Sequence, residues 1–167
     1  MDNHKDFFQS VIEQNKGILI KVSKTYCPNE EDRQDLVQEI MIQIWKSLHT
    51  YNNQFKITTW LYRISLNVAI SFHRKNAIRK GKNNLVKVED SLGFEEDDSS
   101  KELQLNLLEK FINELKEIDK ALILLYLEDK SHAEISEILG ISVSNVGTKI
   151  GRIKENLKQK FTQFKHY

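Results

Sequence analysis

Residues 131–153 read SHAEISEILGISVSNVGTKIGRI, and this stretch predicts two helices joined by a tight turn. Ser131 and Glu134 have the spacing of a capping box, which starts a helix, and Gly140 supplies the left-handed turn that ends it. Ser142 can cap the second helix, in which an inner apolar stripe leaves short polar and Arg side chains outside. The stripe consists of Val143, Val146, Ile150, Ile153 and Leu157, and the outer face is centred on Asn145, Thr148 and Arg152.

Short polar and Arg side chains on the second helix of such a pair fit the major groove of DNA. The stretch therefore predicts a helix-turn-helix. Because the pattern is short, a purely structural helical hairpin is the alternative interpretation.

The rest of the chain also has helical periodicity. One Pro, six Gly and a repeated three-to-four spacing of apolar residues predict an all-α protein of 167 residues. The stretch from Lys80 to Lys101 contains Gly, paired Asn and an acidic cluster and has little to bury, so it resembles a linker. We expect two small helical domains, residues 1–85 and 106–167, joined by a flexible acidic linker over residues 86–105.

The composition excludes several classes of protein. A lone Cys27 cannot form an internal disulfide or a Cys-based zinc site. The longest apolar run, residues 121–127, is far shorter than the ~20 residues of a membrane span. The N-terminal residues lack the basic start and apolar core of a secretory signal. We expect a cytoplasmic protein without membrane insertion.

The charge is unevenly distributed although the net charge is only +1. Residues 1–88 carry 14 basic and 8 acidic side chains (+6), residues 89–128 carry 4 and 12 (−8), and residues 129–167 carry 7 and 4 (+3). No carboxylate occurs between Glu39 and Glu89, where basic and aromatic residues alternate. This mixture suits nucleic acid, because cations neutralise phosphates and aromatic rings stack on bases. A solvated basic surface over an aromatic core is the alternative.

Three neighbouring segments in this basic half carry candidate surfaces. On a helix from Asp35 to Leu48, an apolar stripe leaves Asp35, Gln38, Glu39, Ile42 and Lys46 opposite and Trp45 at the edge. This face suits a basic partner helix, and an ordinary solvated face is the alternative. Residues 50–56 could hold an extruded base, and they are equally typical of a polar turn.

A following helix, capped by Thr58 or Thr59, should bury Leu61, Ile64, Val68 and Phe72. Another of its faces presents Trp60, Arg63, Asn67 and Arg74, which suits a partly unstacked strand. Alternatively, Trp60 belongs to the core and the arginines are solvated.

Two segments in this order and spacing resemble the bacterial extracytoplasmic-function sigma factors, the minimal two-domain family of the sigma-70 superfamily. The first is DLVQEIMIQIW at 35–45, continued by Phe55 and by TWLYRISLN at 59–67 through Arg74-Lys75. The second runs from Leu115 through Tyr126-Leu127-Glu128 and EISEILGIS at 134–142 to Val146 and Arg152.

The resemblance implies that residues 1–85 are sigma region 2 and residues 106–167 sigma region 4. Region 2 would bind the clamp of core RNA polymerase, then recognise and melt the −10 promoter element, while region 4 would read the double-stranded −35 element and meet the polymerase flap. The implied polymerase-binding residues are Asp35, Gln38, Glu39, Ile42 and Trp45. Those for the −10 element are Asn52, Asn53, Gln54, Phe55, Trp60, Arg63, Asn67, Arg74 and Lys75, and those for the −35 element are Ser144, Asn145, Thr148, Lys149 and Arg152.

The resemblance further implies transcription initiation on a specific set of genes, with an anti-sigma factor as a candidate partner and no cofactor. The sequence departs from the family at Ser71, where many members have Asp, and at Gly147, where a basic residue is common. Gly147 and Gly151 each cost the helix about 1 kcal/mol relative to Ala.

Two other functions explain less of the sequence. An autonomous helix-turn-helix regulator would use residues 129–167 and leave the acidic face of residues 35–46 without a role. An enzyme finds no support, because the five His are scattered and neither a catalytic triad nor a Gly-rich phosphate loop can be placed. The acidic cluster Glu30-Glu31-Asp32, with Asp35 and Glu39, lacks a metal-ligand pattern and resembles a solvated helix start.

Overall fold

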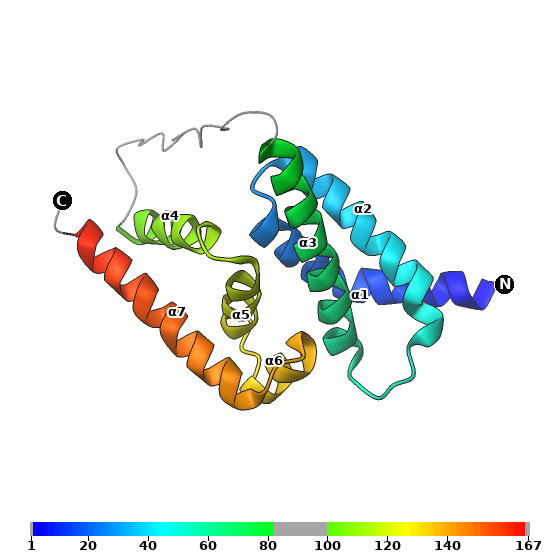
Figure 1. The fold of residues 1–167 in the computed structure, drawn as a ribbon. Coiled ribbons are helices and arrows are strands. Elements are labelled where there is room, and N and C mark those ends of the chain that lie inside the picture. The colour runs from blue at the N-terminus through cyan, green and yellow to red at the C-terminus, as the bar shows by residue number, and fades with distance from the viewer. Residues whose placement is uncertain (1, 82–99, 166–167) are drawn as a thin grey trace.

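The computed structural model describes residues 2–81 and 100–165, which form helices and no strand (Figure 1). The first range holds α1 (Asp2–Tyr26), α2 (Glu30–Ser47), the 3₁₀ helix η1 (Leu48–Thr50) and α3 (Ile57–Gly81). The second holds α4 (Ser100–Asn113), α5 (Glu117–Leu127), α6 (His132–Leu139) and α7 (Val143–Phe164). The all-α prediction is confirmed. Of the predicted linker, residues 86–99 lie outside the described residues, whereas residues 100–105 differ from the prediction and form the start of α4.

Helices α1, α2 and α3 pack against one another around an apolar core. The three-to-four spacing of α2 places Leu36, Ile40 and Ile44 on one face, and all three are fully buried. Asn29 caps α2 by accepting hydrogen bonds from the backbone N–H groups of Glu31 and Asp32. Three carboxylates in the first turn add a favourable interaction with the helix dipole, so this acidic cluster fits the expected solvated helix start.

Helix α3 differs from its prediction in two ways. It begins at Ile57, and the backbone N–H of Trp60 donates to the carbonyl of Lys56, so that neither Thr58 nor Thr59 caps it. The fully buried positions are Thr59, Leu61, Tyr62, Ser65, Leu66 and Ala69, whereas Ile64, Val68 and Phe72 are only partly buried. The buried face is wider than predicted because α3 packs against α1 and α2 and also against α5 and α6.

The C-terminal half forms the predicted helix-turn-helix. Ser131 and Glu134 make both hydrogen bonds of the capping box, Gly140 adopts a left-handed φ of 69°, and Ser142 caps α7. The buried side of α7 is formed by Val146, Ile150, Ile153 and Leu157 as predicted. Val143 is exposed instead, because it stands in the first turn, beyond the contact with α5 and α6.

The two halves lie against each other, with α5 and α6 beside α3 (Figure 1). The Tyr26 hydroxyl donates a 2.6 Å hydrogen bond to the backbone carbonyl of Glu117, and burial raises the pKa of that phenol. Lys120 is only 4% exposed, and its Nζ lies 5.8 Å from the centre of the Tyr26 ring. Burial lowers the pKa of this lysine. The contact between the halves is therefore rich in polar groups.

His73 completes this polar contact. Its Nδ1 lies 3.6 Å from Glu117 Oε1, and its ring packs edge-on against Tyr26. Burial and the charge of Lys120 lower the pKa of His73 below its ordinary value of 6.5, while Glu117 acts in the opposite direction and Lys80 adds a smaller lowering effect. His73 is therefore neutral at pH 7 in this structure.

Because the pKa of His73 is lower in the folded than in the unfolded protein, stabilisation by neutral His73 is complete above pH 6.5 and is lost as the pH falls. We expect the melting temperature to drop between pH 7 and about pH 5.5, and His73→Gln to remove part of that drop. Thermal melts followed by circular dichroism across this range are the measurement. Identical pH profiles for the two proteins would contradict the assignment.

Candidate nucleic-acid and partner interface

The outer face of α2 presents a mixed acidic and apolar surface. The predicted set of Asp35, Gln38, Glu39, Ile42 and Trp45 is exposed along one side of this helix. Ile42 is 52% and Trp45 43% exposed, which is unusual for side chains of this size. On its other edge, the Trp45 ring makes edge-on contacts with His4 and Phe8 of α1. The structure therefore brings together all five predicted residues and holds the indole in place.

The loop between η1 and α3 is held by its own hydrogen bonds. The Tyr51 hydroxyl donates to the Phe55 carbonyl, and the backbone N–H of Gln54 donates to the Asn52 side chain at 3.2 Å. Asn53 has a left-handed φ of 61°, a conformation that Asn tolerates better than most residues. These constraints leave the polar groups of Asn52, Asn53 and Gln54 exposed to solvent. The loop is therefore a hydrogen-bonded turn with polar groups along its outer edge.

Aromatic and cationic side chains converge where this loop meets α3. The guanidinium of Arg63 lies 5.4 Å from the centre of the Phe55 ring, and the rings of Tyr51 and Trp60 are 5.3 Å apart. Trp60 is partly buried, so it both packs on the core and contributes to the surface. A stacking platform beside a cation is suited to an unpaired base and its phosphate.

Further along α3, the predicted residues separate into two groups. Asn67 and Lys75 line a groove of about 390 Å³ between α2 and α3, together with Ser71 and Glu39. Ser71 contributes a hydroxyl group to this groove. Arg74 is 66% exposed, and its Nε lies 3.9 Å from Glu117 of α5. Arg74 is thus shared between the α3 surface and the opposite half of the protein.

The exposed side of α7 carries the predicted −35 residues. Ser144, Asn145, Thr148 and Arg152 are exposed, and Lys149 is partly buried. The Thr148 hydroxyl donates to the Ser144 carbonyl, which orients its methyl group and its remaining lone pair. The residues present hydroxyl, amide and guanidinium groups, which are the groups that read base edges in the major groove.

Gly147 and His132 are in contact across the helix-turn-helix. A Cβ built on Gly147 would lie 3.5 Å from His132 Nδ1, which is an ordinary van der Waals separation. Gly147 and His132 therefore lie side by side, where α6 begins and α7 passes beside it. No neighbour lies within 4 Å of a Cβ built on Gly151.

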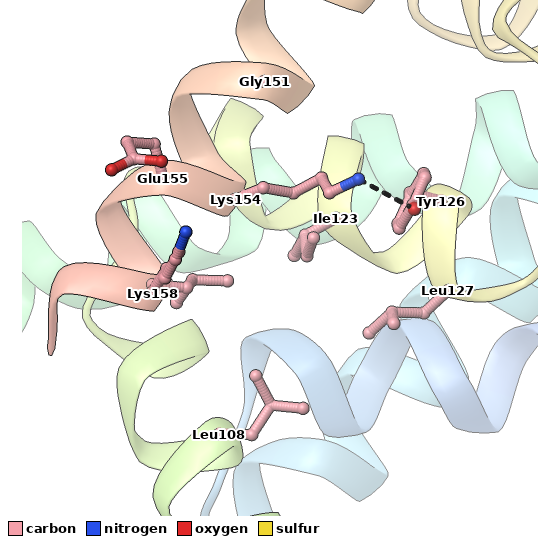
Figure 2. Close-up of a pocket in the computed structure, with 9 residues that line it drawn as sticks. Leu108, Ile123, Tyr126, Leu127, Gly151, Lys154, Glu155 and Lys158 are labelled. Atoms are coloured by element: carbon pink, nitrogen blue, oxygen red, sulfur yellow. Dashed lines mark hydrogen bonds between the residues drawn. The ribbon is translucent and has the colours of Figure 1, made fainter. Parts of the chain in front are cut away.

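An apolar groove between α4, α5 and α7 was not identified from the sequence (Figure 2). It has a volume of about 570 Å³, and Figure 2 shows Leu108, Ile123 and Leu127 on its apolar side with Lys154 and Lys158 at its rim. Lys154 Nζ lies 3.2 Å from the Tyr126 hydroxyl and 5.0 Å from the ring centre, which fixes one edge of the groove. The sequence gives one signal for this groove, the apolar Leu127 at the end of a helix. In the structure, the Leu127 side chain is 52% exposed.

Three further observations concern metal binding, thiol reactivity and membrane-spanning helices in the described residues. Within residues 2–81 and 100–165, no group of three or more His, Cys, Asp and Glu side chains is arranged to hold a metal ion. Burial raises the pKa of the Cys27 thiol to about 11, which keeps it protonated and unreactive. In the same part of the chain, no helix is long and apolar enough to cross a membrane.

Comparison with known proteins accounts for both halves. Residues 11–78 match the family model of sigma-70 region 2, and residues 105–157 match that of sigma-70, region 4. The ECF RNA polymerase sigma factor SigW of Bacillus subtilis is 27% identical over 166 residues, with 93% of this chain and 89% of SigW covered. This chain is an extracytoplasmic-function sigma factor.

Other relatives of this sigma factor agree. CnrH of Cupriavidus metallidurans, named an RNA polymerase sigma factor, is 25% identical over 160 residues, covering 90% of this chain and 84% of CnrH. The solved structure of CnrH with the cytosolic domain of CnrY has a TM-score of 0.69 at 19% identity and covers 95% of this chain and 90% of CnrH. RpoE of Bartonella quintana, solved with the anti-sigma factor NepR, has a TM-score of 0.70 at 16% identity, covering 97% and 98%. The fold is therefore that of these sigma factors.

The environments of the two glycines in α7 give a stability prediction for this sigma factor. Gly151→Ala should raise the free energy of unfolding by about 1 kcal/mol, because Ala restricts the unfolded chain and its methyl group meets open space. Gly147→Ala should stabilise by a similar amount, since its methyl group would make only an ordinary van der Waals contact with His132. Urea denaturation of the two variants is the measurement, and a loss of stability in Gly151→Ala would contradict the helix geometry.

Proposed function

We propose that this sigma factor binds the clamp of core RNA polymerase through the exposed face of α2. The observation that carries the proposal is the uninterrupted row of Asp35, Glu39 and Ile42 beside Trp45, in a chain whose first half is sigma region 2. An apolar centre with flanking carboxylates suits a basic, amphipathic partner helix. The polymerase supplies the catalysis, and we propose no catalytic group on this chain.

The loop Asn52–Phe55 and α3 are proposed to capture the non-template strand of the −10 element. A base extruded from the duplex would enter the polar loop, where Asn and Gln amides can read its edge. Trp60 and the Arg63–Phe55 pair would support the unstacked strand, and Asn67 and Lys75 would continue along the groove beside α2. Binding of the unpaired strand shifts the equilibrium towards melted DNA.

The exposed face of α7 is proposed to enter the major groove of the −35 element. Ser144, Asn145, Thr148 and Arg152 face outward from the second helix of the helix-turn-helix, and Lys149 at its edge would contact phosphate. Gly147 leaves this face without a basic residue that is common in the family. The phosphate contribution to binding should accordingly be smaller than in those relatives.

The apolar groove of the second half is proposed as the site for the polymerase flap. Leu108, Ile123 and Leu127 would receive an apolar helix, and Lys154 and Lys158 at the rim would favour an acidic one. An anti-sigma factor is a proposed second partner, because RpoE was solved with the anti-sigma factor NepR. Such a partner would act in the cytoplasm by covering the polymerase-binding surfaces.

The autonomous-regulator alternative is not favoured. It gives no role to region 2, which the match places over residues 11–78, nor to the exposed Ile42 and Trp45.

The polymerase contact is tested with a triple variant, Asp35→Ala/Glu39→Ala/Ile42→Ala. We expect its affinity for core polymerase to fall at least about tenfold, since two carboxylates and the central apolar residue are lost together. Co-elution with core polymerase in gel filtration and transcription in vitro from selected promoters are the measurements. The matched control Asp6→Ala/Glu13→Ala/Ile20→Ala removes the same groups from an exposed face of α1. Equal binding by both triple variants would refute the assignment of α2.

The −35 contact is tested with Arg152→Ala. Holoenzyme formed with this variant should lose about 1–3 kcal/mol of binding free energy to its preferred promoter, because a guanidinium–base contact is removed. Lys165→Ala, which removes one charge at the far end of the same helix, serves as the control. Electrophoretic mobility shifts with the selected promoter are the measurement. A loss of the same size in the control would show that only net charge matters.

A further inference from the structure

The imidazole of His132 covers one edge of α7, at the position where Gly147 has no side chain. His132 is the first residue of α6, and Figure 1 shows α6 beside the first turns of α7. A Cβ built on Gly147 would lie 3.5 Å from His132 Nδ1 and 3.6 Å from its Cε1. The imidazole therefore stands directly beside the place where a side chain at position 147 would begin.

Position 147 flanks the exposed face of α7. Successive residues of an α-helix are about 100° apart, so positions 147 and 149 lie on opposite sides of Thr148, which is in the middle of this face. When a helix lies in the major groove, the middle of its exposed face meets the base edges and its two flanks approach the sugar–phosphate backbones. Lys149 supplies a cation on one flank, whereas Gly147 supplies none on the other.

The His132 side chain is available to a ligand from outside the protein. It is exposed, and among residues 2–81 and 100–165 no group forms a hydrogen bond or an ion pair with its ring. Beside it lies a groove of about 330 Å³, which is also lined by Tyr126, Leu127, Asp129 and Lys130. Lys130 is directed towards region 2, where its Nζ lies 5.6 Å from the centre of the Tyr62 ring. The imidazole is thus a free hydrogen-bonding group on this flank of α7.

We propose that His132 binds a DNA phosphate beside the −35 element, on the flank of α7 that Gly147 leaves without a cation. This inference rests on the proposed entry of α7 into the major groove. The first helix of a helix-turn-helix crosses the DNA backbone, which brings the start of α6 to the phosphates. A neutral imidazole donates one hydrogen bond to a phosphate oxygen, and a protonated imidazole adds a positive charge. His132 and Lys149 then contact phosphates on opposite sides of the groove.

The phosphate contact of His132 should strengthen as the pH falls, because a phosphate favours the protonated imidazole. The titratable groups that line the groove with His132 are Tyr126, Asp129 and Lys130; Glu134 lies in the same turn of α6, and Lys154 of α7 binds the Tyr126 hydroxyl. Of these side-chain types and imidazole, only imidazole ordinarily changes its charge between about pH 6 and about pH 8. A pH-dependent loss of affinity on removal of His132 therefore reports on its imidazole.

The test measures promoter binding by holoenzyme formed with His132→Ala. The probe is a duplex promoter selected by the wild-type holoenzyme from a randomised library, and electrophoretic mobility shifts are recorded at about pH 6 and about pH 8. We expect the affinity to fall about threefold to tenfold at the lower pH and less at the higher pH, because the charged contact is the stronger one. The matched control Gln159→Ala removes an exposed polar side chain from a later turn of α7 and should bind like the wild type.

A second variant distinguishes a phosphate contact from a purely structural role of His132. His132→Ala/Gly147→Lys moves the cation from α6 to α7 on the same flank, and circular dichroism verifies the helical content. The affinity should return to within about twofold of the wild type at the lower pH. The proposal is overturned if His132→Ala binds as tightly as the wild type at the lower pH, if its loss is equal at both pH values, or if the double variant does not recover.

Arg152→Ala, measured on the same promoter, separates this inference from the proposed function. A loss of affinity in Arg152→Ala without any loss in His132→Ala overturns the phosphate contact alone. If neither variant loses affinity, the assignment of α7 to the −35 element fails as well.

Discussion

The surfaces of region 2 depend on the packing of α3 against α1 and α2. Leu61, Leu66 and Ala69 are fully or almost fully buried between these helices, and this fixes the rotation of α3 about its axis. Once the rotation is fixed, Arg63 meets the loop at Phe55 and Trp60 meets it at Tyr51, while Asn67 and Lys75 face the groove beside α2. Side chains four residues apart share a helix face, so the buried apolar row of α3 determines the position of its exposed side chains. The apolar row of α2 acts in the same way, since burial of Leu36, Ile40 and Ile44 leaves Asp35, Glu39 and Ile42 outside.

The parts of the fold that were predicted from the sequence depend on short-range chemistry. A capping box, a left-handed glycine and a three-to-four apolar spacing each act within one or two helical turns, and the structure contains all three between Ser131 and Leu157. The exposed face of α2 was predicted for the same reason. The errors arose where distant segments meet. Thr59 is buried inside α3 and caps nothing, and the buried face of α3 is widened by α5 and α6, which begin more than 35 residues after α3 ends. The groove at Leu108 and Leu127 is formed by three helices, so periodicity within one helix could not reveal it.

The net charge is near zero because basic and acidic segments of the chain cancel each other. The basic first half and the acidic residues around the start of α5 have opposite charges, and the structure places some of them against each other. Lys21 is 2.5 Å from Glu128, and Glu117 is near both His73 and Arg74. A DNA-binding surface needs unpaired cations when DNA is present, yet such cations attract any polyanion in the cell. The carboxylates that pair with Lys56 and Arg74 lower the positive charge of the surface around these cations.

Two kinds of contact stabilise this protein. The buried Leu, Ile, Val and aromatic side chains of both halves form one apolar cluster, for which exposure to water is costly. Between the halves, the contact includes Tyr26, Lys120, neutral His73 and three ion pairs whose cations are exposed. Polar groups lose hydrogen bonds and ion pairs on separation but regain water, so the net cost of parting them is small. The apolar cluster, which includes residues of both halves, therefore outweighs these polar contacts in the stability of the fold.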